Sequence, residues 1–443
     1  MKHYLLLAVL CLGSAFAKAQ QPKIWTLQEC VQYALDNNID IKQSVLTLEN
    51  IELDKRAAIG SFLPSLNASV SNAWNTGLTQ NIVTGVLENQ VTRNSSYSIT
   101  SGVTLFDGLR NVYQLQRAKM NILATQYNNE QIEDNLLLNV SNAYLNVLFN
   151  KEAVTQLENQ NAVTQQQIDQ TSELVEAGSL PRGDLLEVKA TYAQGVQQVL
   201  AAQNQVLVSK IALAQILNIA DYENFDVADP NLEDPEAFVL DEGVNNIYDN
   251  AVQTRYEIKI AEQNTALAEQ DLKIARGARL PSIDAFFNYN TRETDRDLVN
   301  GWIKQLYLND GISYGLRLSV PIFNQFNVSN RVKRAKVAIE SNKLLETQAK
   351  LDLERNIYQA FNDALASRAT FESSQSALEA RELAFDYAKE RYDVGMMNAF
   401  DFNQAQTTLT NAQIDLLRNK YDYVFKLKVL ELFNGIEAEN LKF

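Results

Sequence analysis

Two pairs of polar side chains repeat one spacing beside long helical segments. Asp184 precedes Glu187 by three residues, and Asp401 precedes Gln404 by the same interval. Paired carboxylates can hydrolyse glycosides, so a carboxylate-dependent hydrolase is one interpretation of so acidic a chain. An acid followed three residues later by glutamate or glutamine at a helix start also resembles a capping box, and its charge complements the helix dipole. The hydrolase interpretation rests on the number of acids in the chain, whereas the spacing of these two pairs indicates helix capping.

The expected mature chain lacks the residues that most other kinds of enzymatic site require. Residues 1–19 have the charged start, the short apolar stretch and the small-residue end of a secretory signal peptide. Cleavage would remove His3, which is the only histidine, together with Cys11. Serine or cysteine triads and histidine-bearing zinc sites are then excluded. We expect no enzymatic activity, no cofactor and no metal site.

The two cysteines add little chemistry. Lipidation at Cys11 is an alternative to simple cleavage, although Leu10 is bulky where a lipoprotein signal carries a small residue. Cys30 lies on a helical face beside Ala34, which is typical of a small core residue. One remaining cysteine cannot form a disulfide within the mature chain.

The net charge of the chain limits the kinds of partner that it can bind. Lysine and arginine total 39 against 54 aspartates and glutamates, giving a net charge of −15. Binding to phosphates needs a basic surface, so we expect no nucleic-acid partner.

The sequence repeats itself in one register. Leu63-Pro64-Ser65 recurs as Leu280-Pro281-Ser282, and 280 − 63 = 217. The same shift pairs many further residues, among them Ala34 with Ala251, Gly60 with Gly277, Gly178 with Gly395 and Asp184 with Asp401. An ungapped duplication predicts two copies of one architectural unit and internal pseudo-symmetry.

Each copy contains one very long helical segment. Residues 111–176 and 330–393 contain neither proline nor glycine, and apolar residues recur there at intervals of three and four. A helix of about 65 residues would be about 100 Å long. Periodicity of this length predicts a coiled coil or a helical barrel.

Each copy also contains two segments that alternate between apolar and polar residues, at about 64–75, 95–106, 281–291 and 311–323. Such segments are typical of transmembrane β-barrel strands, although a strand of a soluble sandwich alternates in the same way. Phe286 interrupts the polar side of the third segment. Between the segments, residues 75–94 and 291–310 are expected to be polar loops.

The number of strands favours a transmembrane barrel that several chains form together. Four strands cannot close a barrel, because even small barrels need about eight. In lipid, an open sheet edge would leave backbone groups without hydrogen bonds. Several protomers must therefore share one barrel, with their long helices bundled in the aqueous phase.

With these motifs in order, the chain resembles the TolC-like outer-membrane efflux protein family of Bacteroidetes-type bacteria. The resemblance rests on the opening Trp25-Thr26-Leu27-Gln28-Glu29-Cys30, on the repeated Leu-Pro-Ser, on Leu105-Phe106-Asp107-Gly108 with Pro321-Ile322-Phe323-Asn324, and on Arg391-Tyr392-Asp393-Val394-Gly395. It implies a mostly α-helical homotrimer whose four strands per protomer form a twelve-stranded β-barrel on a periplasmic α-helical barrel. It also implies a passive duct in the outer membrane that works with a periplasmic adaptor and an inner-membrane transporter.

This fold predicts a division of the chain. The first repeat covers residues 20–218 and the second covers 243–436. Residues 219–242, with two Asp-Pro pairs, form the linker, and 437–443 form a C-terminal tail.

The resemblance assigns roles near the helical tips. The family narrows its periplasmic entrance with aspartates on the second return helix, and Asp401 and Gln404 occupy those positions. Gln404 is not acidic, so this chain departs from the pattern there. Asp184 and Glu187 are the equivalent positions of the first copy. A threefold ring of carboxylates favours cations.

Two further groups at the tips have a structural and a functional interpretation. Arg391 and Tyr392 precede the second turn, and the resemblance places Tyr392 in a network that holds the entrance closed. The turns themselves, Gly178-Ser179-Leu180 and Gly395-Met396-Met397, suit glycine C-caps. The apolar residues of these turns either pack beneath the turn or dock the adaptor. Met397 occupies a position where the family type has a basic residue.

The main alternative function is a periplasmic coiled-coil adaptor, which also has long helical hairpins. An adaptor would carry one hairpin between soluble β-domains, whereas this sequence has two strand pairs that each lead into a long helix.

Overall fold

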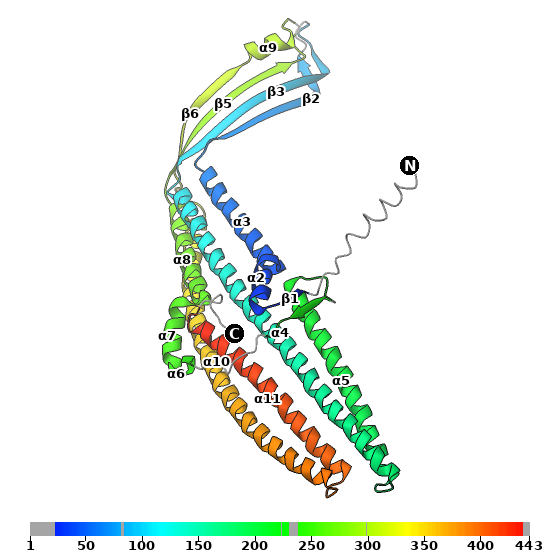
Figure 1. Cartoon of the computed structure of the whole chain (residues 1–443). Helices are drawn as coiled ribbons and strands as arrows, with labels where there is room; N and C mark the ends of the chain where they lie inside the picture. Colours follow the sequence, from blue (N-terminus) through cyan, green and yellow to red (C-terminus); the bar gives the residue numbers. More distant parts are fainter. Residues whose placement is uncertain (1–22, 81–83, 223, 230–237, 298, 437–443) are drawn as a thin grey trace, which may run out of the picture. The chain divides into compact units, whose positions relative to one another are not determined.

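The computed structural model of the chain describes residues 23–80, 84–222, 224–229, 238–297 and 299–436 (Figure 1). The signal peptide expected over 1–19, residues 230–237 of the expected linker and the tail 437–443 lie outside the described residues. The described chain divides into two compact units. Unit 1 contains residues up to Val45, Asn129–Tyr256 and the residues from Lys350 onward, and unit 2 contains Leu46–Asn128 and Glu257–Ala349.

The helices repeat with the interval of the sequence. Helices α4 (Arg110–Glu176) and α10 (Asn327–Asp393) both have 67 residues, and 327 − 110 = 217. The other equivalent pairs are α2 (Leu27–Asn37) with α7 (Val244–Thr254), α3 (Ile39–Gly60) with α8 (Tyr256–Gly277), and α5 (Arg182–Leu217) with α11 (Ala399–Phe433). The predicted duplicated repeat of strand pair and long helical hairpin is therefore confirmed.

Unit 2 contains the predicted sheet. Strands β2 (Ser65–Gln80), β3 (Leu87–Phe106), β5 (Ser282–Thr294) and β6 (Gly311–Ser319) lie in this order and all pair antiparallel. β2 and β6 are the two edges.

The strand bounds differ from the expected ones. β2 and β3 extend through most of the segment expected as a loop at 75–94. The expected loop at 291–310 contains the end of β5 and the short helix α9 (Trp302–Leu308). β6 ends at Ser319 rather than 323, just before Pro321, because proline cannot donate to a ladder.

The pairing register gives the sheet two unlike faces. Leu66 pairs with Ser101, Ser101 with Phe287, and Phe287 with Tyr314, so side chains two residues apart along each strand share one face. The apolar members of that face are Leu66, Ala68, Val70, Trp74, Leu78, Val91, Tyr97, Ile99, Val103, Ala285, Phe287, Tyr289, Ile312, Tyr314, Leu316 and Leu318. Many are uncovered in the single chain, and Leu66 is 75% exposed.

The opposite face is polar. The hydroxyls of Ser69 and Ser98 lie 2.7 Å apart, as do those of Ser71 and Ser96. Phe286, the exception in the sequence pattern, has the Arg317 guanidinium 5.4 Å above its ring centre. The cation–π contact explains how an aromatic ring fits on a polar face.

Unit 1 holds the core and part of the expected linker. Cys30 is fully buried there, as predicted, among residues such as Val140 and Leu213. Strand β1 (Lys23–Trp25) pairs parallel with β4 (Phe225–Val227), and the short helix α6 spans Phe238–Asp241. Tyr144 donates a hydrogen bond to the carbonyl oxygen of Ala228 at 2.7 Å. The strand pair thus joins the segment after α5 to residues 23–25, and the Tyr144 bond joins it to α4.

Candidate functional site

The candidate site lies at the two helical tips, both in unit 1. Helices α4 and α10 end in equivalent turns, where Gly178 and Gly395 each have φ of +73°. The amide of Ser179 donates to Leu174 O, and the amide of Met396 donates to Arg391 O, each at 2.8 Å. This six-to-one bond with a left-handed glycine is a Schellman motif, which ends each long helix at a fixed residue.

The aspartates do not cap the return helices. Asn398 is the N-cap of α11, and its side-chain oxygen accepts from the amide of Asp401 at 2.8 Å. Asp401 is thus the third helical residue, and its carboxylate accepts from the Asn398 side chain at 3.0 Å. Asp184 is likewise the third residue of α5, whose N-cap is Pro181. The capping-box interpretation with Asp184 or Asp401 as the cap is therefore wrong by three residues.

A groove of about 640 Å³ joins the two tips. It brings together five of the predicted residues, namely Leu180, Asp184, Tyr392, Gly395 and Met397. The other predicted residues do not line it, namely Gly178, Ser179, Glu187, Arg391, Met396, Asp401 and Gln404. Of these, Asp401 and Gln404 are exposed on α11.

Tyr392 connects the elements around the groove. Its hydroxyl lies 3.2 Å from the Thr171 hydroxyl on α4. Its ring stacks on Phe402 of α11 with 4.7 Å between centroids and 20° between planes. One residue of the second copy therefore contacts both the first long helix and its own return helix.

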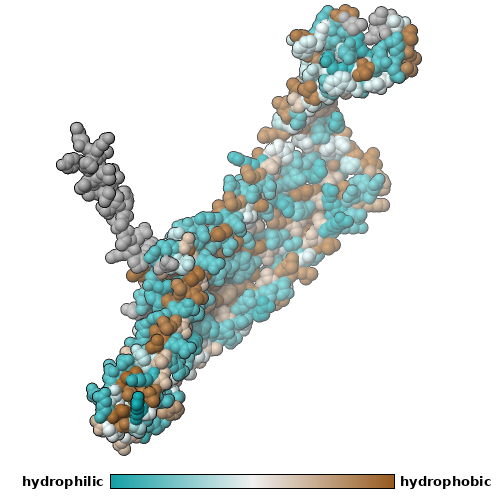
Figure 2. Space-filling model, turned by 90° about the vertical axis from the view of Figure 1, so that its right-hand side faces the viewer, coloured by the Kyte–Doolittle hydropathy of each residue, from teal (hydrophilic) through white to brown (hydrophobic). Residues whose placement is uncertain are grey.

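Apolar side chains remain uncovered around both tips, and brown residues gather at the lower end of the space-filling view (Figure 2). Met396 is 72% exposed, Val394 69%, and Phe400 64%. Leu186 on α5 is 60% exposed. The tips therefore present apolar surface rather than packing all of it beneath the turns.

A buried polar seam between α4 and α11 was not predicted from the sequence. On α4 its members are Thr164, Gln167 and Thr171, and on α11 they are Asn403, Gln406 and Thr410; all six are less than a tenth exposed. Gln406 donates to Gln160 O at 2.9 Å. Among the described residues, the side-chain amides of Gln167 and Asn403 have no hydrogen-bond partner. Buried amides without partners weaken packing, so the seam holds α11 less firmly than an apolar contact would.

Farther along the same helices, Tyr421 of α11 donates to Glu152 of α4. Burial raises the pKa of Tyr421, and the bond to Glu152 raises it further. Near the β1–β4 pair, Asp226 lies 3.0 Å from Lys210 and 3.1 Å from Lys151. Burial alone would raise the pKa of Asp226, but the bonds from these lysines hold it below its ordinary value.

Within the described ranges, no cluster of histidine, cysteine, aspartate and glutamate has the arrangement of a metal site. No described helix combines the length and apolar character needed to cross a membrane.

Comparisons with known proteins agree with this architecture. Residues 30–218 and 247–433 match the family described as "Outer membrane efflux protein". The chain is 23% identical to the outer membrane protein TolC of Escherichia coli (strain K12) over 438 residues, covering 97% of this chain and 85% of TolC.

Solved structures share the fold. A structure of CusC superposes with a TM-score of 0.75 at 18% identity, covering 92% of each chain. The outer membrane protein VceC of Vibrio cholerae gives a TM-score of 0.74 at 15% identity, covering 94% of this chain and 96% of VceC.

Proposed function

Because the chain belongs to the outer membrane efflux protein family, we propose that three copies close into one channel whose entrance is formed by the helical tips. The protein is a channel of the outer membrane that spans into the periplasm and conducts substrates of an efflux or secretion system outward. It is a transport protein, not an enzyme. The family match favours the channel over the periplasmic adaptor.

The open sheet is the observation that carries this proposal. Its apolar face is uncovered, its other face is polar, and both edge strands lack a partner within the described chain. In lipid the edges must be paired, because unpaired backbone groups cost several kcal/mol each. Three copies with four strands each would give twelve strands, an apolar outer wall and a polar lumen.

The entrance is the second part of the proposal. Asp401 is exposed and fixed by Asn398 on the first turn of α11. Around a threefold axis its copies would form a ring of three carboxylates that favours cations. Gln404, one turn further, adds no charge to this ring. Asp184, in the groove with Tyr392, would act on closure rather than on ion selection.

The partners follow from the tips. Apolar side chains exposed around Gly178 and Gly395, such as Leu186 and Met396, suit docking of a periplasmic adaptor that links the channel to an inner-membrane transporter. Two similar tips per chain would give six docking positions in a trimer. The apolar face of the sheet would contact outer-membrane lipid.

Purification in detergent followed by planar-bilayer recording tests the proposal. We expect an SDS-sensitive trimer that conducts ions, with the cation preference reduced in Asp401→Ala. A monomer without conductance would contradict the channel. An unchanged ion preference in Asp401→Ala would contradict only the carboxylate ring.

A further inference from the structure

In the single chain, α8 of the second repeat is more buried than the equivalent helix α3 of the first repeat. Helices α3 and α8 have 22 residues each, and 256 − 39 = 217. The residues of the covered face of α8 are Leu267, Ala268, Gln270, Ala275 and Gly277, which are all buried. Their equivalents on α3, namely Asn50, Ile51, Leu53, Ala58 and Gly60, are not buried. Gln270 is 8% exposed, whereas Leu53 is 50% exposed.

The covered face of α8 lies at the interface between the first and the second repeat of the same chain. Asp271 of α8 accepts from Arg117 Nε of α4 at 2.6 Å. Gln270 donates to the Gln116 side chain at 3.4 Å. The backbone at Gly277 approaches Gly108 so closely that a Cβ on either glycine would lie less than 3.0 Å from the other's carbonyl oxygen.

Shifting the residues of this interface by 217 positions gives an equivalent set of residues on α10 and α3. Arg117 maps onto Arg334, because 117 + 217 = 334, and Asp271 maps onto Asp54, because 271 − 217 = 54. Both residue types are retained, and both side chains are exposed. Neither forms an ion pair in the described part of the chain. Both charged residues of the pair are thus present, but they do not pair with each other within the described part of one chain.

We propose that the bare face of α3 is the binding surface for α10 of a second copy, with Arg334 of one chain bound to Asp54 of the next. The interface between chains then repeats the interface within the chain. This inference rests on the proposed trimer and specifies the residues that join its chains.

The same shift fixes the register of the closing strands. Within the chain, Thr100 of β3 pairs with Asn288 of β5. Shifting the first by +217 and the second by −217 gives Arg317 of β6 and Ser71 of β2. In the same way Ser101 with Phe287 becomes Leu318 with Val70, so the apolar face continues across the joint. β2 and β6 are the two edges of the sheet, so this pairing needs a second chain.

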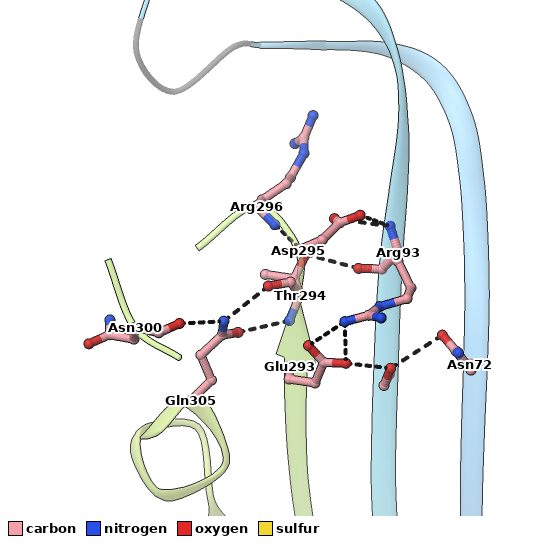
Figure 3. A network of polar contacts seen from close by, with 9 residues as sticks. Asn72, Arg93, Glu293, Thr294, Asp295, Arg296, Asn300 and Gln305 are labelled. Atoms are coloured by element: carbon pink, nitrogen blue, oxygen red, sulfur yellow. Dashed lines mark hydrogen bonds and ion pairs between the residues drawn. The ribbon is translucent and has the colours of Figure 1, made fainter. Parts of the chain in front are cut away.

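The interface within the chain and the proposed interface between chains differ at both ends of the paired strands. Between β3 and β5, Arg93 Nη2 lies 3.1 Å from Glu293 Oε1, and Ser95 donates to the same oxygen at 2.7 Å (Figure 3). The shift maps Arg93 onto Asp310 and Glu293 onto Thr76, which cannot form this pair. At the opposite end, where β3 leads into α4, Gln325 replaces Gly108. A Cβ at Gly108 would meet the carbonyl oxygen of Gly277, so the backbones in the interface between chains must lie farther apart there. The interface between chains is therefore the weaker of the two.

Cysteine crosslinking tests the register. In a Cys30→Ala background, Ser71→Cys with Arg317→Cys should form a disulfide between chains, visible as covalent dimer and trimer on a nonreducing gel. Direct cross-strand partners lie within disulfide reach, whereas positions offset by two residues are about 7–8 Å apart. Ser71→Cys with Ser319→Cys is the matched control, which should crosslink much less.

The outcomes separate the inference from the proposed function. A trimer that crosslinks through the control pair, or through neither pair, would overturn the inferred register while leaving the channel. A protein that stays monomeric in detergent would remove the proposed trimer itself.

Charge exchange tests the helical part of the surface without requiring a disulfide. Asp54→Arg and Arg334→Asp should each reduce the trimer fraction in detergent, and the double exchange should restore it. Loss without restoration would overturn the Asp54–Arg334 contact. Circular dichroism of each variant distinguishes lost assembly from lost folding.

Discussion

The hydroxyl of Tyr392 lies 3.2 Å from that of Thr171 and so joins α10 of the second copy to α4 of the first. The same tyrosine ring stacks on Phe402. The two contacts can be separated, because phenylalanine keeps the ring and removes the hydroxyl.

Tyr392→Phe should favour the open entrance. A typical hydrogen bond contributes about 1 kcal/mol, which corresponds to about a fivefold shift between closed and open channels. Single-channel recording should show a higher open probability. Thr171→Val removes the same bond from the other side, and the double variant should add nothing to either single variant. Additive effects would show that the bond is not the relevant contact.

Asp401→Asn should reduce cation selectivity while preserving side-chain size. Its reversal potential in a salt gradient should move toward that of an unselective pore, because three negative charges are removed from the proposed ring. Asn398→Ala is the matched control, since it removes the cap and keeps the charge. We expect it to cost about 1 kcal/mol of helix stability and to leave selectivity unchanged. Equal selectivity in all three proteins would contradict the ring.

The long helices could be predicted closely from the sequence. The absence of proline and glycine over 111–176 left no point of interruption, and α4 spans Arg110–Glu176. The turns at the helical tips could also be predicted from the sequence, because glycine is the residue that adopts a positive φ without strain. Local chemistry decided both features.

Features that depend on distant contacts were missed. The β1–β4 pair joins three-residue strands about 200 positions apart in sequence, and so short a strand has no periodic signal. The outer halves of β2 and β3 are rich in serine, threonine and asparagine, which are typical of loops. Thr164, Gln167 and Thr171 have helical core spacing, but polar residues at that spacing read as an exposed face until a partner helix is known.

The buried amides of the polar seam give a third prediction. Gln167→Leu should stabilise the packing of α4 against α11, because it replaces an amide without hydrogen-bond partners among the described residues by an apolar group of similar size. We expect the unfolding temperature to rise and the open probability to fall. Gln165→Leu, on the exposed face of the same helix, is the control. Destabilisation by Gln167→Leu would show that the amide is satisfied in the assembled channel.

Asp226 gives a prediction for acid. Its pKa is lowered in the folded chain by Lys210 and Lys151, so the stability it contributes is present above the unfolded value of 3.8 and is lost as pH falls below it. Asp226→Asn should flatten the fall in unfolding temperature as pH decreases through 3.8 and below it. Asp221→Asn, at an exposed position before β4, is the control. Parallel slopes for the wild type and Asp226→Asn would contradict the assignment.

The tip glycines allow backbone strain to be tested apart from packing. A Cβ on Gly395 would meet nothing within 4 Å, but its φ of +73° disfavours any side chain. Gly395→Ala should therefore cost about 1–2 kcal/mol locally, which corresponds to about tenfold faster amide hydrogen exchange over 391–400. Gly183→Ala is the matched control, because its Cβ also meets nothing and its φ lies in the ordinary range. If both alanines leave exchange unchanged, the turn does not depend on the left-handed glycine. If Gly395→Ala speeds exchange and also weakens adaptor binding, the geometry of the turn, rather than its apolar side chains alone, forms the docking surface.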